Sequence, residues 1–444
     1  MGRLLLSCVL FLAACKVSGD NSPEACMQCA DITTHAWCAA SASCVGIHDS
    51  CEYGLLSTDS QCDQPQLFEP TVLAVDCRQP DATDPRCDPD HNAPPKAIGK
   101  GPMDNFYAFG GGFIDAANHR LVTAFSCDIC SQKDSGVMAI DLTTGDRTLV
   151  SGQVNDTLLG IQKVGTGDRI SSLDDVQPAP GGKWWALDSI SGAAQIIEID
   201  PATGNRTIVY PQEQFLQDGG ICKVGTLGIA LGFGASSNSF TSGLANIVVH
   251  PDGKVYIRGG RAYDKQLNEL DLYAIAELDH GACRIVTAFS TKMPDLAVGN
   301  GPTFNEMYDW LGERNGALVA GVSEYYMHAI DIASGDRTMI SSAATGGMLG
   351  DGGALGAAFV TSSPDGATLL TTGKFNTETF GGTVNIDVAT GTRTTLAPAA
   401  GPQKNGDDGL PIAMPGLDGV YVIASLGMVT LYEPATGNSM FLSR

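Results

Sequence analysis

Variants of one short phrase, Asp-x-x-Thr-Gly-x-Arg-Thr, recur along the C-terminal three quarters of this chain. Four variants keep the ending Gly-x-Arg-Thr, a fifth keeps only Thr-Gly, and a sixth, Glu277-LDHGACR, is more degenerate, with Arg284 slipped by one position. In chain order the copies begin at Asp141, Asp200, Glu277, Asp331, Asp387 and Glu433. An internal repeat constrains a fold more strongly than any single motif does, and six copies predict six structural units.

Each phrase has the features of a β-hairpin. An apolar run comes first, for example residues 137–140, and it is followed by Asp, a turn whose glycine tolerates positive φ, and a β-prone Arg-Thr run. A second hairpin signal lies upstream of three copies, at Pro180-Gly-Gly, Pro251-Asp-Gly and Pro364-Asp-Gly. Two hairpins for each copy predict a four-stranded antiparallel sheet in each unit.

The spacing of the copies favours a β-propeller. Successive copies begin between 46 residues (387 to 433) and 77 residues (200 to 277) apart, and a propeller blade takes ~40 to 50 residues. The alternative is a run of β-sandwiches, but one unit of this length holds too few strands for a sandwich. The sequence therefore predicts an all-β fold, a six-bladed β-propeller of four-stranded blades over residues 96–444, in which radial repetition protects the strand edges.

Four arginines, one from each well-kept phrase, recur at the same position of the repeat. They are Arg147, Arg206, Arg337 and Arg393. A side chain that every blade needs belongs to the blade framework rather than to a single active site. We expect each guanidinium to be held by the Asp of its own phrase or by carbonyl groups of the adjoining blade.

The first unit, with the segments GKGPMDNFYAF, FIDAANHRLVTAFS and VMAIDLTTGDRTLVS, resembles bacterial six-bladed propellers of the NHL-repeat type and, more distantly, gluconolactonase-like propellers. The stretch ALDSISGAAQIIEID (186–200) is similar to the NHL pattern of a strand, Asp-Ser, a short loop and an Ile-rich strand. The resemblance covers residues 96–444 and implies an architecture that hosts many functions.

The first residues have the pattern of an export signal. Met1-Gly-Arg is followed by the apolar run LLLSCVLFLAA, which is too short for a retained membrane-spanning helix, and then by Cys15. Leu12-Ala-Ala-Cys15 resembles the bacterial lipobox, which implies cleavage before Cys15 and its lipidation; the alternative is an ordinary secretory signal cut elsewhere. Residues 1–15 are therefore expected to be a lipoprotein signal peptide with its anchor cysteine. Lys16, where many inner-membrane lipoproteins have Asp, favours the outer membrane of the bacterial cell envelope.

Cysteines are concentrated in residues 16–95, which contain little apolar sequence for a core. Without Cys8 and Cys15, twelve cysteines remain, an even number that indicates disulfides formed in an oxidising compartment. The candidates are Cys26, Cys29, Cys38, Cys44, Cys51, Cys62, Cys77, Cys87, Cys127, Cys130, Cys222 and Cys283. We expect the first eight to staple a small disulfide-rich stalk module, which a Pro-rich linker joins to the propeller.

The stretch CMQCADITTHAWCAASASCV (26–45) is similar to the plexin-semaphorin-integrin cysteine-rich repeat, with Trp37-Cys38 in place of its Trp-Cys core. That family usually has a further cysteine where this chain has His35, so its disulfide connectivity does not carry over. Modules of this kind act as spacers beside larger domains. The alternative for this stretch is a zinc site formed from Cys26, Cys29, Cys38, Cys44 or His35.

Two cysteine pairs lie inside the predicted propeller. Cys127-Asp-Ile-Cys130 has the spacing of a redox motif, but a thioredoxin-type thiolate sits at a helix N-terminus, and this pair follows a predicted strand. We interpret it as a structural staple of a loop, with redox chemistry as the alternative. Cys222 and Cys283 flank the third unit, and a bridge between them would brace the largest blade.

The chain is strongly acidic, with 26 basic residues, 49 acidic residues and a formal net charge of -23. This charge disfavours nucleic acid and bare anionic membrane as partners. The carboxylates can bind Ca²⁺ or simply keep an exported protein soluble. The sequence contains no Gly-x-Ser-x-Gly elbow, no His-Glu-x-x-His motif and no phosphate-binding loop, and its seven histidines are scattered singly.

One candidate metal site lies at the propeller axis. If the Gly-x-Gly-Pro segments at 99–102 and 299–302 open the innermost strands, Asn105 and Asn305 occupy equivalent positions near the axis, with Asp168 and Asp309 nearby. The resemblance to gluconolactonase-like propellers implies a Ca²⁺ ion held there by Glu, Asn and Asp side chains, although this chain has no one-to-one match to that ligand set. The implied reaction is metal-assisted hydrolysis of a lactone or ester.

Together these features predict a lipid-anchored, monomeric, extracytoplasmic propeller that acts as a binding or scaffold module for a protein or small-molecule ligand. The alternative is a Ca²⁺-dependent lactonase or esterase with its site at the propeller axis. No cofactor is expected apart from the Ca²⁺ of that alternative. Carboxylate or amide oxygens that converge at the axis would favour the enzyme, and an apolar or glycine-lined channel would favour the binding module.

Overall fold

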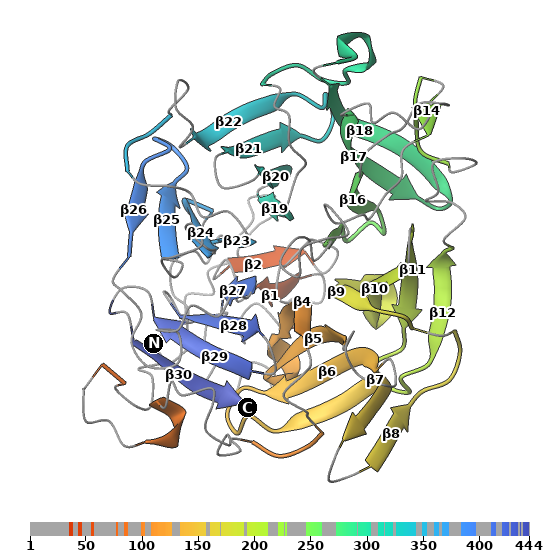
Figure 1. The fold of residues 1–444 in the computed structure, drawn as a ribbon, viewed down its shortest axis with the longest axis vertical. Helices are drawn as coiled ribbons and strands as arrows, with labels where there is room; N and C mark the ends of the chain where they lie inside the picture. Colours follow the sequence, from red (N-terminus) through yellow and green to blue (C-terminus); the bar gives the residue numbers. More distant parts are fainter. Residues whose placement is uncertain are drawn as a thin grey trace, which may run out of the picture.

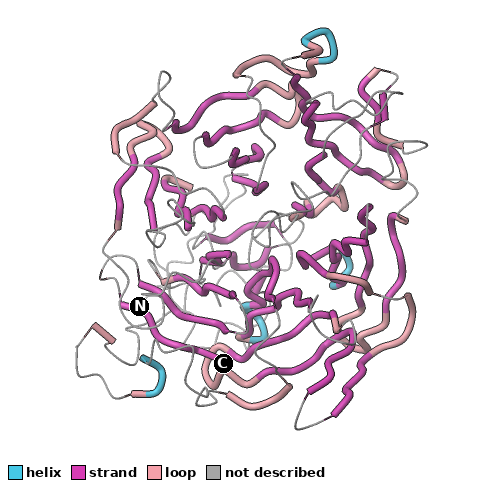
Figure 2. The backbone as a smooth tube through the Cα atoms, in the orientation of Figure 1, coloured by secondary structure: helices cyan, strands magenta, loops and turns pink. Residues whose placement is uncertain are grey.

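The structure is a computed structural model, and its described residues are almost entirely β-strands and turns, with helix only in short 3₁₀ segments (Figure 2). The residues that the structure describes are 35–38, 43–46, 55–56, 77–78, 84–87, 99–102, 108–126, 134–156, 160–168, 170–190, 193–211, 221–225, 227–228, 246–259, 272–290, 292–302, 310–314, 316–322, 326–342, 349–352, 359–363, 366–372, 383–396, 410–413, 420–425, 428–433, 436 and 438–443. Within these residues, no helix is long and apolar enough to cross a membrane.

Six antiparallel sheets surround a central axis as the blades of a propeller (Figure 1). Blade one consists of β4 (Ala108–Asp115), β5 (Arg120–Ser126), β6 (Ser135–Asp141), β7 (Arg147–Asp156) and β8 (Gly160–Val164). Blade two consists of β9 (Leu173–Ala179), β10 (Lys183–Ile190), β11 (Ala193–Ile199) and β12 (Arg206–Tyr210). Blade three consists of β15 (Ile247–Val249), β16 (Val255–Gly259), β17 (Leu272–Asp279) and β18 (Ala282–Ser290).

The other three blades follow the same order. Blade four consists of β19 (Trp310–Arg314), β20 (Ala317–Val322), β21 (Tyr326–Asp331) and β22 (Arg337–Ser342). Blade five consists of β23 (Phe359–Ser362), β24 (Thr368–Thr372), β25 (Thr383–Asp387) and β26 (Arg393–Thr395). Blade six consists of β27 (Leu410–Ala413), β28 (Tyr421–Ser425), β29 (Met428–Glu433) and β30 (Asn438–Ser443).

The first strand of each blade is the innermost, and these strands close the ring. Contacts run from β4 through β9, β15, β19, β23 and β27 and back to β4. The six-bladed all-β propeller predicted from the repeat is therefore confirmed. Blade one differs from the expected four strands, because β8 pairs with β7 as a fifth, outer strand.

A small sheet, a hairpin and four 3₁₀ segments complete the described elements. A three-stranded sheet, ordered β2-β1-β3, consists of β1 (His35–Cys38), β2 (Ser43–Gly46) and β3 (Leu55–Leu56). A hairpin of β13 (Lys223–Val224) and β14 (Leu227–Gly228) precedes blade three. The 3₁₀ segments are η3 (Pro85–Cys87), η4 (Ala116–Asn118), η5 (Pro180–Gly182) and η7 (Pro294–Leu296).

In each antiparallel blade the first and third turns lie at the same end of the sheet. These turns together form one face of the ring, which we call the turn face. The first turn of blade one contains η4, and β3 contacts η4. The small N-terminal sheet therefore lies on the turn face, and Figure 1 draws β1 and β2 over the centre of the ring.

The repeated phrase forms the third turn of a blade. In blade one, the Asp141 carboxylate accepts the backbone N–H groups of Thr143 at 2.9 Å and Thr144 at 2.7 Å. Gly145 follows with a φ of 72°, and its N–H donates to the Asp141 carbonyl at 2.9 Å. Asp caps the turn through its side chain, and glycine supplies the left-handed residue that ends it.

Apolar side chains fill the space between neighbouring blades. Blades one and two share a buried cluster in which the rings of Phe113 and Trp184 meet edge-on, with centroids 5.7 Å apart. Blades two and three share another buried cluster, which includes Tyr210 and Cys222. The ring is thus held by a succession of cores between blades rather than by one central core.

The repeat arginines connect successive blades through what we call latches. In each latch, Nη1 of the arginine donates to a Ser or Thr hydroxyl on the fourth strand of the preceding blade, at 2.5 to 2.9 Å. The four pairs are Arg147–Ser443, Arg206–Ser151, Arg337–Thr287 and Arg393–Ser341. The first pair joins blade six to blade one across the ring closure. As expected for one of the two arrangements, carbonyl groups of the adjoining blade also hold the guanidinium, for example that of Val164 for Arg206.

Segments that precede four of the blades lie against the outer strands of those blades. We call these segments straps; they have the sequence Gly-x-Gly and are residues 99–101, 165–167, 299–301 and 350–352. The carbonyl of the middle residue accepts the N–H of the repeat arginine at 2.6 to 2.8 Å. At Gly299, φ is 73° and a Cβ would lie 1.9 Å from the carbonyl oxygen of Gly335, so only glycine fits. The straps thus lie at the outer edge of the ring.

Blade three departs from the repeat. Its third turn has two residues between the paired positions (280–281), where blade one has four (142–145). Asp279, rather than Glu277, therefore stands at the position of the phrase Asp, and Cys283 stands at the position of the latch arginine. Cys283 forms a disulfide with Cys222, which lies in the segment before β15. A covalent bond therefore takes the place of the missing latch arginine.

The preceding blade is adjusted to the same change. Tyr210 of β12 occupies the position of the latch hydroxyl, and its own hydroxyl accepts the backbone N–H groups of His280 and Gly281 in the third turn of blade three. Tyr210 is 2% exposed. The junction between blades two and three is thus closed by a tyrosine and a disulfide instead of an arginine and a serine.

The disulfide Cys77–Cys87 lies on blade six. The segment η3 contacts β30, and the Cys77 N–H donates to Oδ1 of Asn438 at 2.9 Å. This part of the region that the sequence assigned to a stalk therefore packs against the propeller. Eight predicted disulfide cysteines have no described side chain: Cys26, Cys29, Cys38, Cys44, Cys51, Cys62, Cys127 and Cys130. The anchor Cys15 also lies outside the described residues.

Candidate functional site

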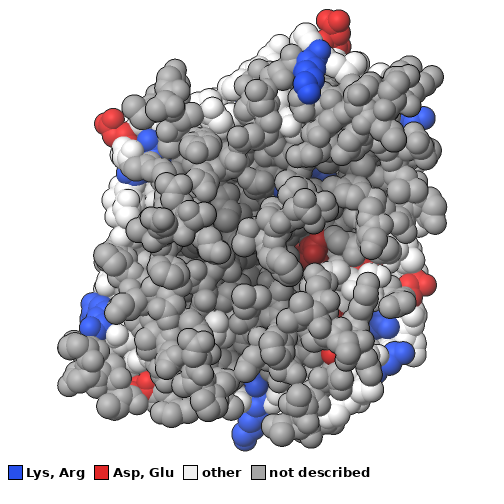
Figure 3. All heavy atoms as spheres, in the orientation of Figure 1, with Lys and Arg blue, Asp and Glu red and all other residues white. Residues whose placement is uncertain are grey.

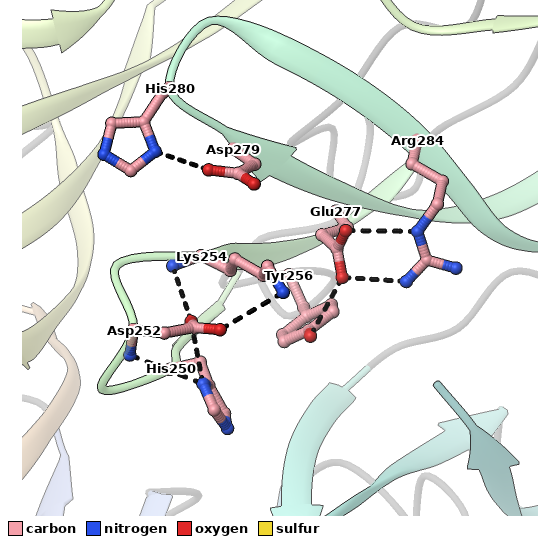
Figure 4. Close-up of polar contacts among 8 residues, drawn as sticks. All are labelled: His250, Asp252, Lys254, Tyr256, Glu277, Asp279, His280 and Arg284. Carbon is pink, nitrogen blue, oxygen red and sulfur yellow. Dashed lines mark hydrogen bonds and ion pairs between the residues drawn. The ribbon is translucent and has the colours of Figure 1, made fainter. Parts of the chain in front are cut away.

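Blade three carries a group of polar side chains that extends beyond the repeated phrase. We call it the blade-three cluster; it consists of His250, Asp252, Lys254, Tyr256, Glu277, Asp279, His280 and Arg284 (Figure 4). The group comes from the first turn, the two middle strands, the third turn and the start of β18. Because the first and third turns share one end of the sheet, these side chains gather on the turn face.

Glu277 is the best-held member of the cluster. Arg284 donates to its two carboxylate oxygens, from Nε at 3.1 Å and from Nη2 at 2.8 Å, and the Tyr256 hydroxyl donates at 3.0 Å. The hydrogen bond from Arg284 holds the pKa of Glu277 below its usual range, although burial opposes it. Burial, followed by the negative charge of Glu277, raises the pKa of Tyr256. Glu277 is therefore a charged acceptor with no proton to give near neutral pH.

Arg284 also reaches the next blade. Its Nη1 donates to the carbonyl of Ile332, in the third turn of blade four, at 3.0 Å. The guanidinium side chain is 44% exposed, whereas the Glu277 side chain is 10% exposed. Arg284 therefore covers a buried carboxylate with a cation that is still accessible from solvent.

Asp252 organises the first turn of blade three. Its carboxylate accepts the backbone N–H of Lys254 at 3.1 Å and lies 2.8 Å from Nδ1 of His250 and 3.2 Å from the Lys254 ammonium. Burial alone would raise the pKa of Asp252, but the hydrogen bonds from Lys254 and His250 lower it overall. The same carboxylate raises the pKa of Lys254, so this pair is fully ionised near neutral pH.

The third turn presents the most exposed members of the cluster. Nδ1 of His280 lies 2.5 Å from the Asp279 carboxylate, and the two side chains are 83% and 46% exposed. The backbone of His280 is left-handed, with a φ of 46°, because this tight turn needs a positive φ where the longer phrase uses glycine. The imidazole consequently projects from the turn next to a carboxylate.

Glu313, on the innermost strand of blade four, interacts electrostatically with the cluster. Burial raises the pKa of Glu313, while His250 lowers it and Asp252 raises it. The carboxyl of Glu313 therefore lies in the field of the first turn of blade three, close to the rim of the central axis. Among the described acidic residues in and around the blade-three cluster, Glu313 is the one whose pKa is shifted toward neutral pH.

The blade-three cluster is chemically suited to bind a polar or charged partner. It offers carboxylates, an ammonium, a guanidinium and two imidazoles on adjacent turns, which suits hydrogen bonding and charge pairing with a partner. In the part of the chain that the structure describes, no group of three or more His, Cys, Asp or Glu is placed to hold a metal ion. On the face drawn in Figure 3, the described basic and acidic side chains lie in small separate groups rather than in one continuous patch.

Of the four residues predicted for the axial metal site, the structure describes only Asp168. Asp168 follows a strap, and its carboxylate accepts the N–H of Ile208 on the outermost strand of blade two at 3.1 Å. Its carbonyl accepts Nε of Arg206 at 3.0 Å. Asp168 is therefore part of a blade edge and not of the axis. Asn105, Asn305 and Asp309 lie outside the described residues.

Close packing brings other groups to the innermost strands. Asp175 on β9 is fully buried, and its carboxylate accepts the N–H of Ile247, the first residue of β15 in blade three, at 2.9 Å and Nε2 of Gln177 at 3.0 Å. A Cβ on Gly111 would lie 2.1 Å from this carboxylate, so blade one also presses against it. Burial raises the pKa of Asp175 to about 7. Asp175 thus clasps the inner edges of three successive blades.

Sequence reasoning did not predict the blade-three cluster. The signal for it was the poor match of the Glu277 copy to the phrase, which we interpreted as degeneration of the repeat. The shorter turn instead changes which side chains reach the surface. It places Arg284 one residue after the latch position and opposite Glu277, with which it pairs.

No protein-family model matches the sequence, and no curated protein is similar to it in sequence. Among solved structures, similarity extends to an oligogalacturonate lyase in complex with manganese, with 12% identity over 78% of this chain and 86% of that chain and a TM-score of 0.38. TolB from Acinetobacter baumannii is 13% identical over 73% of this chain and 80% of that chain, with a TM-score of 0.38. BamB from Moraxella catarrhalis is 15% identical over 73% of each chain, with a TM-score of 0.34. These likenesses concern the fold alone.

Proposed function

We propose that this protein is a lipid-anchored, extracytoplasmic binding platform, in which the turn face of the propeller recognises a protein or small-molecule partner. The anchor is Cys15, the compartment is the bacterial cell envelope on the outer-membrane side, and the working unit is a monomer. The blade-three cluster supplies the polar contacts of the recognition surface.

The proposal rests on a difference between the polar residues that hold the blades together and those that are exposed on the turn face. Those that recur in every well-kept blade are used inside the ring, the arginines in latches and the phrase Asp residues in turns. Two contacts of the blade-three cluster have counterparts in blade two, Trp185–Glu198 and Lys183–Asp200, but Asp252, His280 and Arg284 have none there. His280 and Arg284 are exposed on the turn face. A surface that one blade alone carries is the expected place for a specific contact.

The disulfides support the compartment. Cys222–Cys283 replaces a latch at a blade junction, and Cys222 is completely buried there. A bridge with this structural role requires folding in an oxidising environment. The net charge of -23 favours polar protein or small-molecule partners over nucleic acid.

Site-specific photocrosslinking in cells tests the proposal. A photoreactive amino acid at His280 should give a discrete adduct, and the same amino acid at Thr203, exposed in the corresponding turn of blade two, should give none. Adding Asp279→Asn and Arg284→Ala to the His280 probe should reduce the adduct. Equal labelling from both turns, or from neither, would contradict a blade-three recognition surface.

Fractionation tests the anchor separately. Cys15→Ser should move the protein from the detergent-rich phase to the soluble fraction of the envelope. Unchanged membrane association of this variant would refute the lipid anchor. If the protein instead hydrolyses lactones or esters, activity should depend on Ca²⁺ and be abolished by a chelator, and that result would favour the axial enzyme over the platform.

A further inference from the structure

The segment that precedes β27 in blade six lies outside the described residues, and among the described residues the N-terminal region makes to blade six a contact that the straps make elsewhere. In blades one, two and four, the middle residue of the strap makes a second contact besides the one to the arginine. Its N–H donates to the side chain of the residue just before the arginine, in the pairs Lys100–Asp146, Thr166–Asn205 and Asn300–Asp336 at 2.7 to 2.9 Å.

Asn438 is the residue of blade six at this position. It pairs with Glu433, as Asp146 pairs with Asp141 in blade one, and it begins β30. Its Oδ1 accepts the N–H of Cys77 at 2.9 Å, across 361 residues of sequence. Cys77 therefore makes to blade six the contact that Lys100 makes to blade one.

The disulfide shapes this N-terminal contact. Cys77 is bonded to Cys87, ten residues later, and the two are 6% and 5% exposed. Asp84 and Arg86, inside the closed loop, form an ion pair at 2.8 Å. The repeat straps take their shape from two glycines with positive φ, but Asp76-Cys77-Arg78 contains none. The covalent loop supplies the constraint that glycines supply elsewhere.

We propose that the loop closed by Cys77–Cys87 makes the strap contact of blade six and that its disulfide holds this loop as a clasp on β30. Reduction by a dithiol breaks the S–S bond and yields two thiols, and the dithiol becomes a disulfide, so electrons and protons balance. The freed loop then releases the start of β30. The other end of this strand carries Ser443, which accepts the Arg147 latch, so the clasp acts on the strand that closes the ring.

Hydrogen exchange of the full chain, followed by mass spectrometry, tests this. The variant Cys77→Ser with Cys87→Ser should exchange the amides of β30 about tenfold faster while β18 keeps its protection. The matched control, Cys222→Ser with Cys283→Ser, should show the converse, with β18 exposed and β30 unchanged. Adding a dithiol to the control should reproduce the β30 effect.

A second pair of variants keeps both disulfides and addresses the contact itself. Asn438→Ala removes the acceptor and should raise exchange in β30 as the cysteine variant does, whereas Asn438→Asp restores an oxygen acceptor, as Asp146 provides in blade one, and should keep protection. Unchanged exchange of β30 in both the cysteine variant and Asn438→Ala would overturn the proposal. Faster exchange spread over all six blades would overturn it as well, because it would show global destabilisation instead of a local clasp.

Discussion

Arg206 offers the clearest measurement of what a latch contributes. Its guanidinium is 7% exposed and donates to the Ser151 hydroxyl at 2.9 Å and to the carbonyls of Asp168 at 3.0 Å and Val164 at 3.1 Å. A hydrogen bond from a charged donor contributes ~1.5 to 3 kcal/mol net, but contacts of one group are not additive. Ser151 keeps a partner after truncation, because its hydroxyl donates to the Gly204 carbonyl at 2.8 Å.

We therefore expect Arg206→Ala to lower the free energy of unfolding by about 3 kcal/mol and the thermal midpoint by roughly 5 °C, given the size of the ring. Scanning calorimetry measures the midpoint, and a double-mutant cycle with Ser151→Ala should give a coupling of about 1 kcal/mol or more. The control is Lys254→Ala, which removes a partly exposed ion pair with Asp252 and should leave the midpoint nearly unchanged. Equal midpoints for Arg206→Ala and Lys254→Ala would refute a framework role for the latch.

Three further predictions follow from the blade junctions. Burial raises the pKa of Asp175 to about 7 from an unfolded value near 3.8, so its contribution to stability is complete below about pH 4 and is lost as pH rises through 7. The thermal midpoint of Asp175→Asn, measured relative to that of the wild type, should therefore increase from pH 5 to pH 8. A difference that stays constant with pH would contradict the assignment. Gly299→Ala should lower the free energy of unfolding, measured by chemical denaturation, several times more than Gly160→Ala does. Both glycines have a φ of 73°, but an added Cβ would lie 1.9 Å from a carbonyl oxygen at Gly299 and would have no atom within 4 Å at Gly160. Equal losses would show that φ alone matters. Tyr210→Phe should lower the unfolding free energy by ~1 kcal/mol by removing the acceptor for two turn amides, and an unchanged midpoint would argue that water replaces it fully.

The blade architecture could be predicted from sequence because its determinants are local. A turn capped by Asp141 and ended by Gly145 is specified within five residues, so its recurrence reveals the hairpin and its count reveals the ring. The strand β8 was missed because nothing near Gly160 differs from an ordinary connection after a blade. It forms only because β7 continues far enough to pair with it.

The straps could not be placed from sequence because their partners are distant. A Gly-x-Gly segment predicts a backbone with positive φ, but it does not show which carbonyl group that backbone approaches. For Gly99 the carbonyl belongs to Gly145. We expected such segments to open the innermost strands and therefore assigned Asp168 to the axis. The structure shows Asp168 at the outer strand, where its carboxylate meets the backbone of Ile208.

Blade three was misaligned for a different reason. Glu277 and Gly281 reproduce the offset of the phrase by chance, while the turn is shorter and begins at Asp279. Register is a property of paired strands, and a shortened turn moves it without changing local composition. The one correct hint in this region was the pair Cys222 and Cys283, whose bridge the structure contains.

The latch between Arg147 and Ser443 has a consequence for biosynthesis. The two residues are 296 positions apart, so the ring stays open until the chain through residue 443 has emerged, whereas the ends of the Cys77–Cys87 loop are only ten positions apart. Local loops and hairpins can therefore form while the first five blades are still an unclosed arc with exposed strand edges. During this interval a chaperone that covers exposed strand edges would be of most use.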